Sequence, residues 1–235
     1  MKISQMISSV AIATSIVTVA AIVSPMSAKA VSFTFGNIAG GDTVGDGFKG
    51  SLSMDVTSLG NGVLFKFNNI GTAAAPDSYI GTVYIDDANS FLKAASIGVN
   101  YPTGNSGTVK FKGGADTQTL PQSGNLPALL AFTTDYSFTK DGGASNGVQA
   151  GESLGVLFSN TNFTKVLDAI NDGSLRVGYH LQSLPPLYRG GTTSDSYINN
   201  PGTPRPVPVP GFVLGVMAAG ALGGTRLLKN KKQAV

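Results

Sequence analysis

The residues that most often carry catalysis are scarce in this chain. His180 is the only histidine and there is no cysteine, so neither a cysteine nucleophile nor a thiolate metal site can be built. A serine triad needs a histidine base beside a serine and an acid. The two Gly-x-Ser-x-Gly stretches, 143–147 and 151–155, do not lie between a predicted strand and a predicted helix, so no strained nucleophile elbow is expected. His180 falls on the polar side of an alternating segment, which predicts an exposed side chain. These features predict a protein that is not an enzyme.

Asp86 and Asp87 form the densest acidic pair in the sequence. They come at the end of a predicted strand, where aspartates commonly support turns through bonds to the backbone. Their oxygens could also bind Ca²⁺ in an extracellular domain, so they are weak candidates for a metal site in a chain otherwise expected to need no cofactor. No EF-hand spacing accompanies them, and a structural role is the favoured interpretation.

Sugar chemistry has two further sets of candidate residues. Glycosidases usually need two carboxylates on either side of the scissile bond, and the only glutamate, Glu152, lies in a predicted turn. Exposed tyrosines could form a carbohydrate platform, although tryptophan, which such platforms favour, is missing. Alternation places Tyr136 and Tyr179 inward, so core packing is the favoured role. The six tyrosines considered are Tyr79, Tyr84, Tyr136, Tyr179, Tyr188 and Tyr197.

The composition favours a β-rich domain with many turns. Glycine accounts for 31 of 235 residues, only 12% of residues are charged, and 42% are hydrophobic. All 13 acidic residues but only 10 of the 16 basic residues lie between positions 31 and 210, because the other six basic residues are at the two ends. The central domain is therefore mildly acidic, and no nucleic-acid partner is expected.

Alternating polar and apolar residues predict a series of β-strands separated by Gly, Asn and Asp turns. One segment, 79–85, is apolar on both faces and is expected to be a central strand. Phe132, in the segment 130–138, is expected to be buried. The alternating segments are 31–35, 52–56, 63–67, 130–138 and 175–181, with shorter candidates at 97–101, 108–112 and 154–158.

One short helix is expected between the last strands. Asn162 can cap it, and Gly173 can end it in a left-handed conformation. Its apolar stripe consists of Phe163, Val166, Leu167 and Ile170, and Leu167 is expected to be buried. About nine strands with one helix predict a mainly β fold, specifically a β-sandwich of the jelly-roll or immunoglobulin-like kind.

The N-terminus has the layout of an export signal. Lys2 precedes an apolar run at 10–23, too short for an ordinary membrane span, and Ser24-Pro25 breaks it. Ala28 and Ala30 then supply the small residues that signal peptidase accepts. Residues 1–30 are therefore expected to form a signal helix that signal peptidase removes.

The C-terminus has three parts. Residues 201–210 are a proline-rich spacer, 211–228 an apolar segment expected to form a transmembrane helix, and 229–235 a basic tail. The positive-inside rule keeps this tail cytoplasmic, so the domain at 31–200 faces outward. The residues that set this topology are Arg226, Lys229, Lys231 and Lys232.

This tail resembles the PEP-CTERM class of sorting signals, which exosortases recognise. That class carries Pro-Glu-Pro before the span, and here Pro208, Val209 and Pro210 occupy the position, without the acidic residue. Several stretches of the domain, 62–65, 84–87, 163–170, 175–182 and 194–199, are similar to cyanobacterial PEP-CTERM surface proteins. The resemblance implies an exosortase as partner and a protein sorted to the cell surface, and it implies no catalytic residues.

The sequence therefore predicts an exported, non-enzymatic cell-surface or extracellular-matrix protein. It is held in the membrane by its C-terminal helix, or released to the surface after processing. The alternative is an extracellular module that binds a glycan of the exopolysaccharide layer or Ca²⁺, and a secreted hydrolase is the third hypothesis.

The first prediction concerns export. Because Ala28 and Ala30 occupy the positions that signal peptidase recognises, N-terminal sequencing of the exported protein should begin at Val31. A mature chain that still begins at Met1 would contradict the cleavable signal.

Overall fold

The computed structural model describes residues 30–92, 97–115, 118–185, 193–199 and 205–206. Most of the predicted signal segment, including Ala28, lies outside these ranges, and so do Pro208, Val209, Pro210 and the whole apolar C-terminal segment. Ala30 is the first residue of the first strand.

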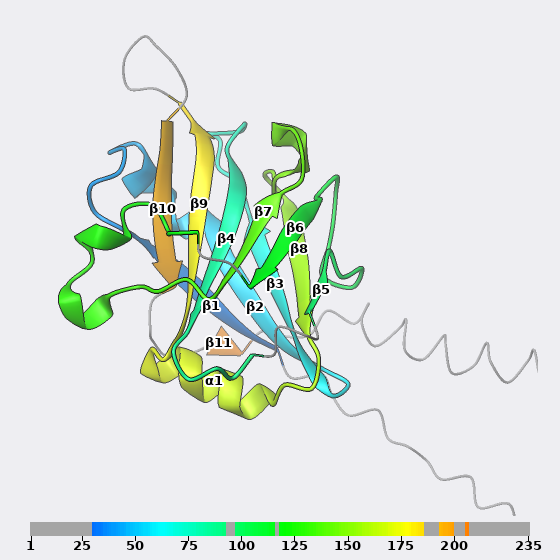
Figure 1. The fold of residues 1–235 in the computed structure, drawn as a ribbon. Coiled ribbons are helices and arrows are strands. Elements are labelled where there is room, and N and C mark those ends of the chain that lie inside the picture. Colours follow the sequence, from blue (N-terminus) through cyan, green and yellow to red (C-terminus); the bar gives the residue numbers. More distant parts are fainter. Residues whose placement is uncertain (1–29, 93–96, 116–117, 186–192, 200–204, 207–235) are drawn as a thin grey trace, which may run out of the picture.

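The described chain is mainly β, as the sequence predicted, and its strands form one antiparallel sheet that curves almost into a barrel (Figure 1). The order of strands is β5-β8-β3-β2-β1-β10-β9-β4-β7-β6, with the short β11 pairing with β1. The strands are β1 (Ala30–Asn37), β2 (Leu52–Leu59), β3 (Gly62–Asn69), β4 (Tyr79–Asp87), β5 (Ile97–Val99), β6 (Phe111–Ala115), β7 (Tyr136–Lys140), β8 (Glu152–Phe158), β9 (Leu175–Leu184), β10 (Thr193–Asn199) and β11 (Arg205–Pro206).

Strand β1 joins the two halves of the sheet. Its first part pairs with β2, from Ala30 opposite Thr57, and its last part pairs with β10, with Phe35 opposite Asn199. At the other side of the molecule, the outermost strands β5 and β6 approach each other next to Asn100. The Asn100 side chain donates to the Phe111 carbonyl and accepts from the Phe111 N–H, both at 2.8 Å.

The inner face of the sheet encloses one aromatic-rich core. Phe35 of β1 stacks on Tyr179 of β9, with ring centroids 3.9 Å apart. Phe158 of β8 makes edge-to-face contacts with Phe65, Tyr136 and Phe138 at centroid distances of 5.6, 5.6 and 6.3 Å. Because these rings come from both halves of the sheet, each half shields the apolar face of the other from water.

Strand β4 is buried along its whole length, which confirms the prediction of a central strand. Its outer face is covered because residues 118–135 cross the outside of β10, β9 and β4. Leu120 of this segment packs so closely on β9 that a Cβ on Gly178 would lie 2.6 Å from a Leu120 methyl carbon. The second, smaller hydrophobic cluster formed there contains Ile38, Tyr84, Leu120, Leu126, Phe132 and Ile198.

Helix α1 (Phe163–Asp172) has the predicted bounds. The Asn162 side chain accepts a hydrogen bond from the Lys165 N–H at 3.0 Å, and Gly173 ends the helix with φ of 81°. The predicted burial of Leu167 is wrong in degree: the buried line of the helix is Val166, Ala169 and Ile170, and Leu167 packs at its margin, half-exposed.

The predicted strand at 130–138 is also wrong in its first half. Residues Ala128–Leu130 form the short 3-10 helix η4, and only β7, beginning at Tyr136, joins the sheet. The carbonyls of Leu130 and Ala131 accept hydrogen bonds from Arg176, so they are not available to a strand ladder. Phe132 is therefore half-buried in the smaller cluster, outside the main core. The remaining 3-10 helices are η1 (Gly45–Ser51), η3 (Ser123–Asn125) and η5 (Ala144–Asn146).

The alternating segment 175–181 was predicted to be the last strand of the domain, but two more strands, β10 and β11, follow it. β10 pairs with β9, with Tyr197 opposite Tyr179, and β11 pairs with the beginning of β1. The chain therefore returns at residue 206 to the place where it entered the domain at residue 30.

Truncation of Phe158 tests this core. Phe158→Ala removes a wholly buried ring with three aromatic neighbours, so the free energy of unfolding should fall by about 3–5 kcal/mol in urea titrations of the full-length chain. The matched control is Ile70→Ala, because Ile70 is 64% exposed and its loss should change stability by less than about 0.5 kcal/mol. Equal effects of the two variants would contradict this assignment of the core.

Candidate functional site

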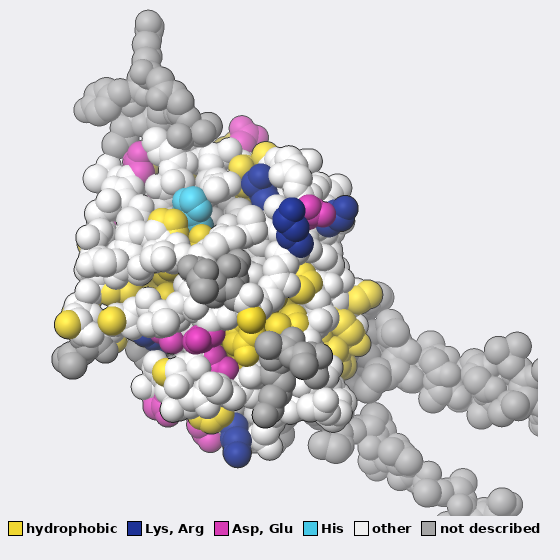
Figure 2. All heavy atoms as spheres, in the orientation of Figure 1, with side chains coloured by type: hydrophobic (Ala, Val, Ile, Leu, Met, Phe, Trp, Pro, Cys, Tyr) yellow, Lys and Arg dark blue, Asp and Glu magenta, His cyan; other side chains and the backbone are white. Residues whose placement is uncertain are grey.

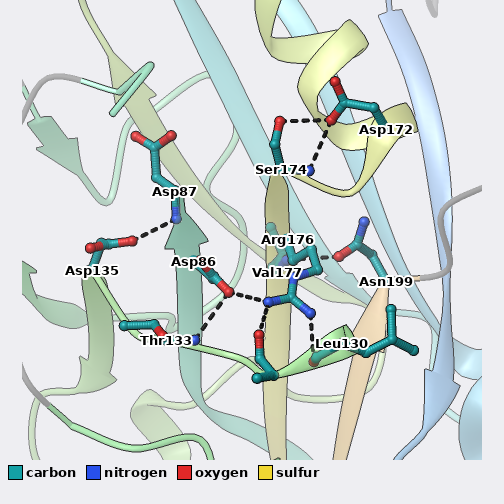
Figure 3. Close-up of polar contacts among 11 residues, drawn as sticks. Asp86, Asp87, Leu130, Thr133, Asp135, Asp172, Ser174, Arg176, Val177 and Asn199 are labelled. Atoms are coloured by element: carbon teal, nitrogen blue, oxygen red, sulfur yellow. Dashed lines mark hydrogen bonds and ion pairs between the residues drawn. The ribbon is translucent and has the colours of Figure 1, made fainter. Parts of the chain in front are cut away.

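Asp86 lies at the end of β4, directly opposite Arg176 of β9, and the two side chains form a buried ion pair (Figure 3). The Asp86 carboxylate also accepts the Thr133 N–H at 3.0 Å. Arg176 donates further to the carbonyls of Leu130 and Ala131. The pair therefore fastens the segment before β7 to the sheet, with the guanidinium serving as a fixed fork of donors.

Asp87 is buried and holds the turn that follows β4. Its carboxylate accepts the N–H groups of Phe91 at 2.9 Å and Leu92 at 2.7 Å. Its own N–H donates to Asp135 at 2.7 Å (Figure 3). Burial raises the pKa of Asp87 above its usual range, the two backbone bonds oppose this, and the charges of Asp135 and Asp86 add to it.

The two weak candidates for Ca²⁺ are consecutive residues of β4 whose side chains leave opposite faces of the strand, and both already accept hydrogen bonds from the protein. A cation here would have to displace Arg176 from Asp86 and the loop N–H groups from Asp87. Within the described ranges, no group of three or more His, Cys, Asp or Glu residues could hold a metal ion. The arrangement acts as a structural clamp between β4, β9 and their loops.

His180 is half-buried rather than exposed, which corrects the prediction from alternation. The segment at 118–135 lies over this face of the sheet, and burial lowers the pKa of the imidazole. Figure 2 shows histidine reaching the surface among uncharged atoms, and its Nδ1 lies 3.4 Å from the Gln182 amide nitrogen. Ser196 lies opposite His180 on β10, but it is wholly buried and out of reach of a substrate.

The other candidates for sugar chemistry also make structural contacts. The two carboxylate oxygens of Glu152 accept the N–H groups of Thr108 at 2.9 Å and Gln149 at 3.0 Å. The predicted inward direction of Tyr136 and Tyr179 is confirmed. The five tyrosines of the proposed platform that lie in described residues, all at most 8% exposed, are Tyr79, Tyr84, Tyr136, Tyr179 and Tyr197, and Tyr188 lies outside them.

A buried carboxylate that sequence reasoning missed lies in β10. Asp195 accepts the Asn37 amide at 2.7 Å and the Ser196 N–H at 2.8 Å. Gly41 and Gly45 pack against it so closely that a Cβ on either would lie within 2.0 Å of a carboxylate oxygen. Burial raises the pKa of Asp195, its two hydrogen bonds oppose this, and the charges of Asp46 and Asp42 add to it.

An open hollow of about 630 Å³ adjoins this carboxylate. Its walls come from the end of β1 and the turn that follows, and its polar lining includes Asn37, Thr43, Asp46 and Lys49. In the sequence, this site is represented only by the glycine run at 40–41 and the polar stretch at 194–196. Each stretch is typical of a turn or a polar strand. Nothing in either one indicates that the two lie in contact in the fold, so the site could not be predicted.

A second hollow, of about 370 Å³, lies on the outer face of β2, β3 and β8. The Asn68 amide there donates to Asp55 at 3.0 Å and to the Ser53 hydroxyl at 3.3 Å, while Asp55 also accepts the Ser32 hydroxyl. The exposed Ile70 lies on its rim. Such a mixture of hydroxyl, amide and carboxylate groups can exchange hydrogen bonds with the hydroxyls of a ligand.

No family model matches the chain, and no curated protein or solved structure matches it significantly. The described part of the chain holds no helix long and apolar enough to cross a membrane. The candidate sites therefore rest on the contacts and chemistry of this chain alone.

The raised pKa of Asp195 predicts a pH dependence of stability. Because the folded state binds this proton more tightly than the unfolded chain does, the contribution is complete below pH 3.8 and is lost as pH rises through the raised pKa. Asp195→Asn removes the titration. The melting temperature of the wild type relative to this variant should therefore be higher at pH 3.5 than at pH 7.

Asp172→Asn is a control of opposite sign. Hydrogen bonds from Ser174 lower the pKa of the exposed Asp172, so its contribution is present above its usual pKa and is lost as pH falls. The wild type should lose its advantage over this variant on acidification. Parallel pH profiles for the two variants would contradict the assignment for Asp195.

Proposed function

We propose that the chain is an exported, non-enzymatic cell-surface or extracellular-matrix protein whose β domain is displayed from a C-terminal anchoring or sorting segment. The observation that carries the proposal is the pairing of β11 with β1, where Pro206 lies opposite Val31 and Arg205 opposite Ser32. The chain enters and leaves the domain side by side. A tether after residue 206 would hold the domain by this end and leave the opposite end free.

The chemistry of the domain supports display rather than catalysis. Asp86, Asp87 and Glu152 accept hydrogen bonds from the domain's own loops, and the only histidine contacts Gln182. These groups maintain the positions of loops. In an exported chain without cysteine, such contacts supplement the hydrophobic core in the role that disulfides commonly have.

The route to the surface follows from the two ends of the sequence. Signal peptidase would cleave after Ala30, and an exosortase would recognise the region of Pro208, Val209 and Pro210. Until that cleavage the apolar segment 211–228 would span the membrane, with Arg226 and the lysines beyond it on the cytoplasmic side.

For the architecture we propose the β-sandwich class rather than a closed barrel. β1 divides the sheet into two halves that face each other across the core. Their far edges meet through the Asn100 side chain at Phe111. A closed barrel would have a backbone ladder between these edge strands instead.

A second candidate function is a module that binds a glycan or Ca²⁺. The hollow beside Asp55 and Asn68 favours the glycan, since its side chains already form a hydrogen-bonded array on the outer face of the sheet. For Ca²⁺ the support is weaker, because Asp86 and Asp87 are engaged by Arg176 and by loop N–H groups.

Intact-mass measurement of the membrane and extracellular fractions tests the sorting step. With an exosortase present, we expect the extracellular protein to end near Pro208-Val209-Pro210, because the apolar segment is short and rich in glycine and alanine and so holds weakly. In a strain lacking the exosortase, the protein should keep its tail and remain in the membrane fraction.

Deletion of residues 211–235 is the control and should release the domain in both strains. A full-length tail in both strains would leave anchoring as the only role of the C-terminus. Recovery of the protein from the cytoplasm, with its N-terminus intact, would overturn the proposal of export.

A further inference from the structure

Three lysines gather where β6 and β7 meet. Lys110 immediately precedes β6, Lys112 lies within it, and Lys140 ends β7 opposite Phe111. Figure 2 shows Lys and Arg side chains grouped here around a carboxylate, with few other charges nearby on that face. In a chain with only 12% charged residues, three like charges within two paired strands are unexpected.

Asp141 is the carboxylate in this lysine cluster. It lies 3.4 Å from the Lys110 ammonium and 3.2 Å from that of Lys112. The bonds from Lys112 and then Lys110 lower the pKa of Asp141, so it is ionised and neutralises one charge. Lys140 instead donates to the Gly142 carbonyl at 2.9 Å and lies 5.8 Å from the centre of the Tyr79 ring. Two ammonium groups thus pair with one carboxylate, and the third, on the residue before Asp141, is bonded to Gly142 instead.

Two of the three lysines are exposed, and Lys140 is half-buried. The side chains of Lys110 and Lys112 are 65% and 71% exposed, whereas that of Asp141 is 37% exposed. Exposed ion pairs of this kind contribute little to stability, so stability does not explain the cluster. Flexible ammonium groups that stay hydrated can instead exchange one carboxylate for another at low cost.

The cluster lies away from the tether. In Figure 1 the turn that follows β7 is at the end of the sheet opposite to β11 and α1. The register agrees, because β7 runs from Tyr136, opposite Ile85, towards the Tyr79 end of β4, while the Asp87 end of β4 pairs with Leu175 just after α1. A domain held at residue 206 would present this end outward.

We infer that Lys110, Lys112 and Lys140 bind an anionic polysaccharide, with a uronate carboxylate of the polymer taking the place of Asp141. The inference rests on the proposed export, which brings the domain into contact with extracellular polymers. A nucleic acid is disfavoured, since single strands need exposed aromatic rings to stack on, and the Tyr79 ring is 8% exposed beneath Lys140.

Binding to alginate, a polyuronate, tests this inference with the full-length chain in mild detergent at low ionic strength. Lys110→Gln and Lys112→Gln should each weaken binding by about two- to fivefold, the range of exposed ion pairs. Asp141→Asn should strengthen binding by a similar factor, because it removes the competing carboxylate. Raising the salt concentration to about 1 M should abolish binding, since the Debye length falls to about 3 Å.

Lys165→Gln is the matched control, because Lys165 is an exposed lysine on α1 at the other end of the domain. It should leave alginate binding unchanged, and neutral dextran should not bind. Equal losses for Lys165→Gln and Lys112→Gln, weaker binding by Asp141→Asn, or tighter binding of DNA than of alginate would overturn the inference. Its failure is distinct from failure of the proposed export, which is read from cell fractions and not from binding.

Discussion

The fold depends on how β1 pairs along its two edges. Two different strands share one edge of its eight residues. β10 pairs with its last part and β11 with its first, while β2 pairs along the other edge. Phe33 and Phe35 alternate inward from this strand into the core, and Phe35 stacks on Tyr179 of the other half. Without β1 the two halves would be open sheets, each with an apolar face and an unpaired edge.

Buried carboxylates hold in place connections that the hydrophobic core does not fix. Most connections between strands are long, and ordering a long connection costs conformational entropy that core packing offsets only in part. Asp86, Asp87 and Asp195 each accept hydrogen bonds from groups belonging to a connection or its neighbouring strand. The raised pKa values of Asp87 and Asp195 show that desolvation outweighs those bonds, so their burial fixes loop positions at a cost to stability near neutral pH.

The elements predicted correctly from the sequence are those whose two faces differ in polarity. The elements that were missed depend on contacts with residues far away in the chain. The alternation at 52–56 and 63–67 and the cap and stop of α1 are local signals, and the elements lie where they were expected. The segment at 130–135 alternates equally well, but its carbonyls bind Arg176, about 45 residues away in the chain. β10 was missed for the converse reason. Asp195 and Ser196 are polar, which indicates exposure, but both are buried, and the distant Gly41 and Gly45 pack directly against Asp195.

The two ends of the domain differ in how far their polar groups are engaged by internal bonds. At one end, the Asp86–Arg176 pair and the Asp87 turn lie close to where the chain enters and leaves, and the polar groups of the pair and the turn are engaged in internal bonds. At the other end, the ammonium groups of the exposed lysines beside Asp141 are largely solvated by water. A ligand can gain free energy only from groups whose present partners are weak, so binding is expected at the second end. Under the proposal that the chain leads from residue 206 to a membrane anchor, a domain held at one end and charged at the other would need no catalytic residue to link a membrane to a polymer.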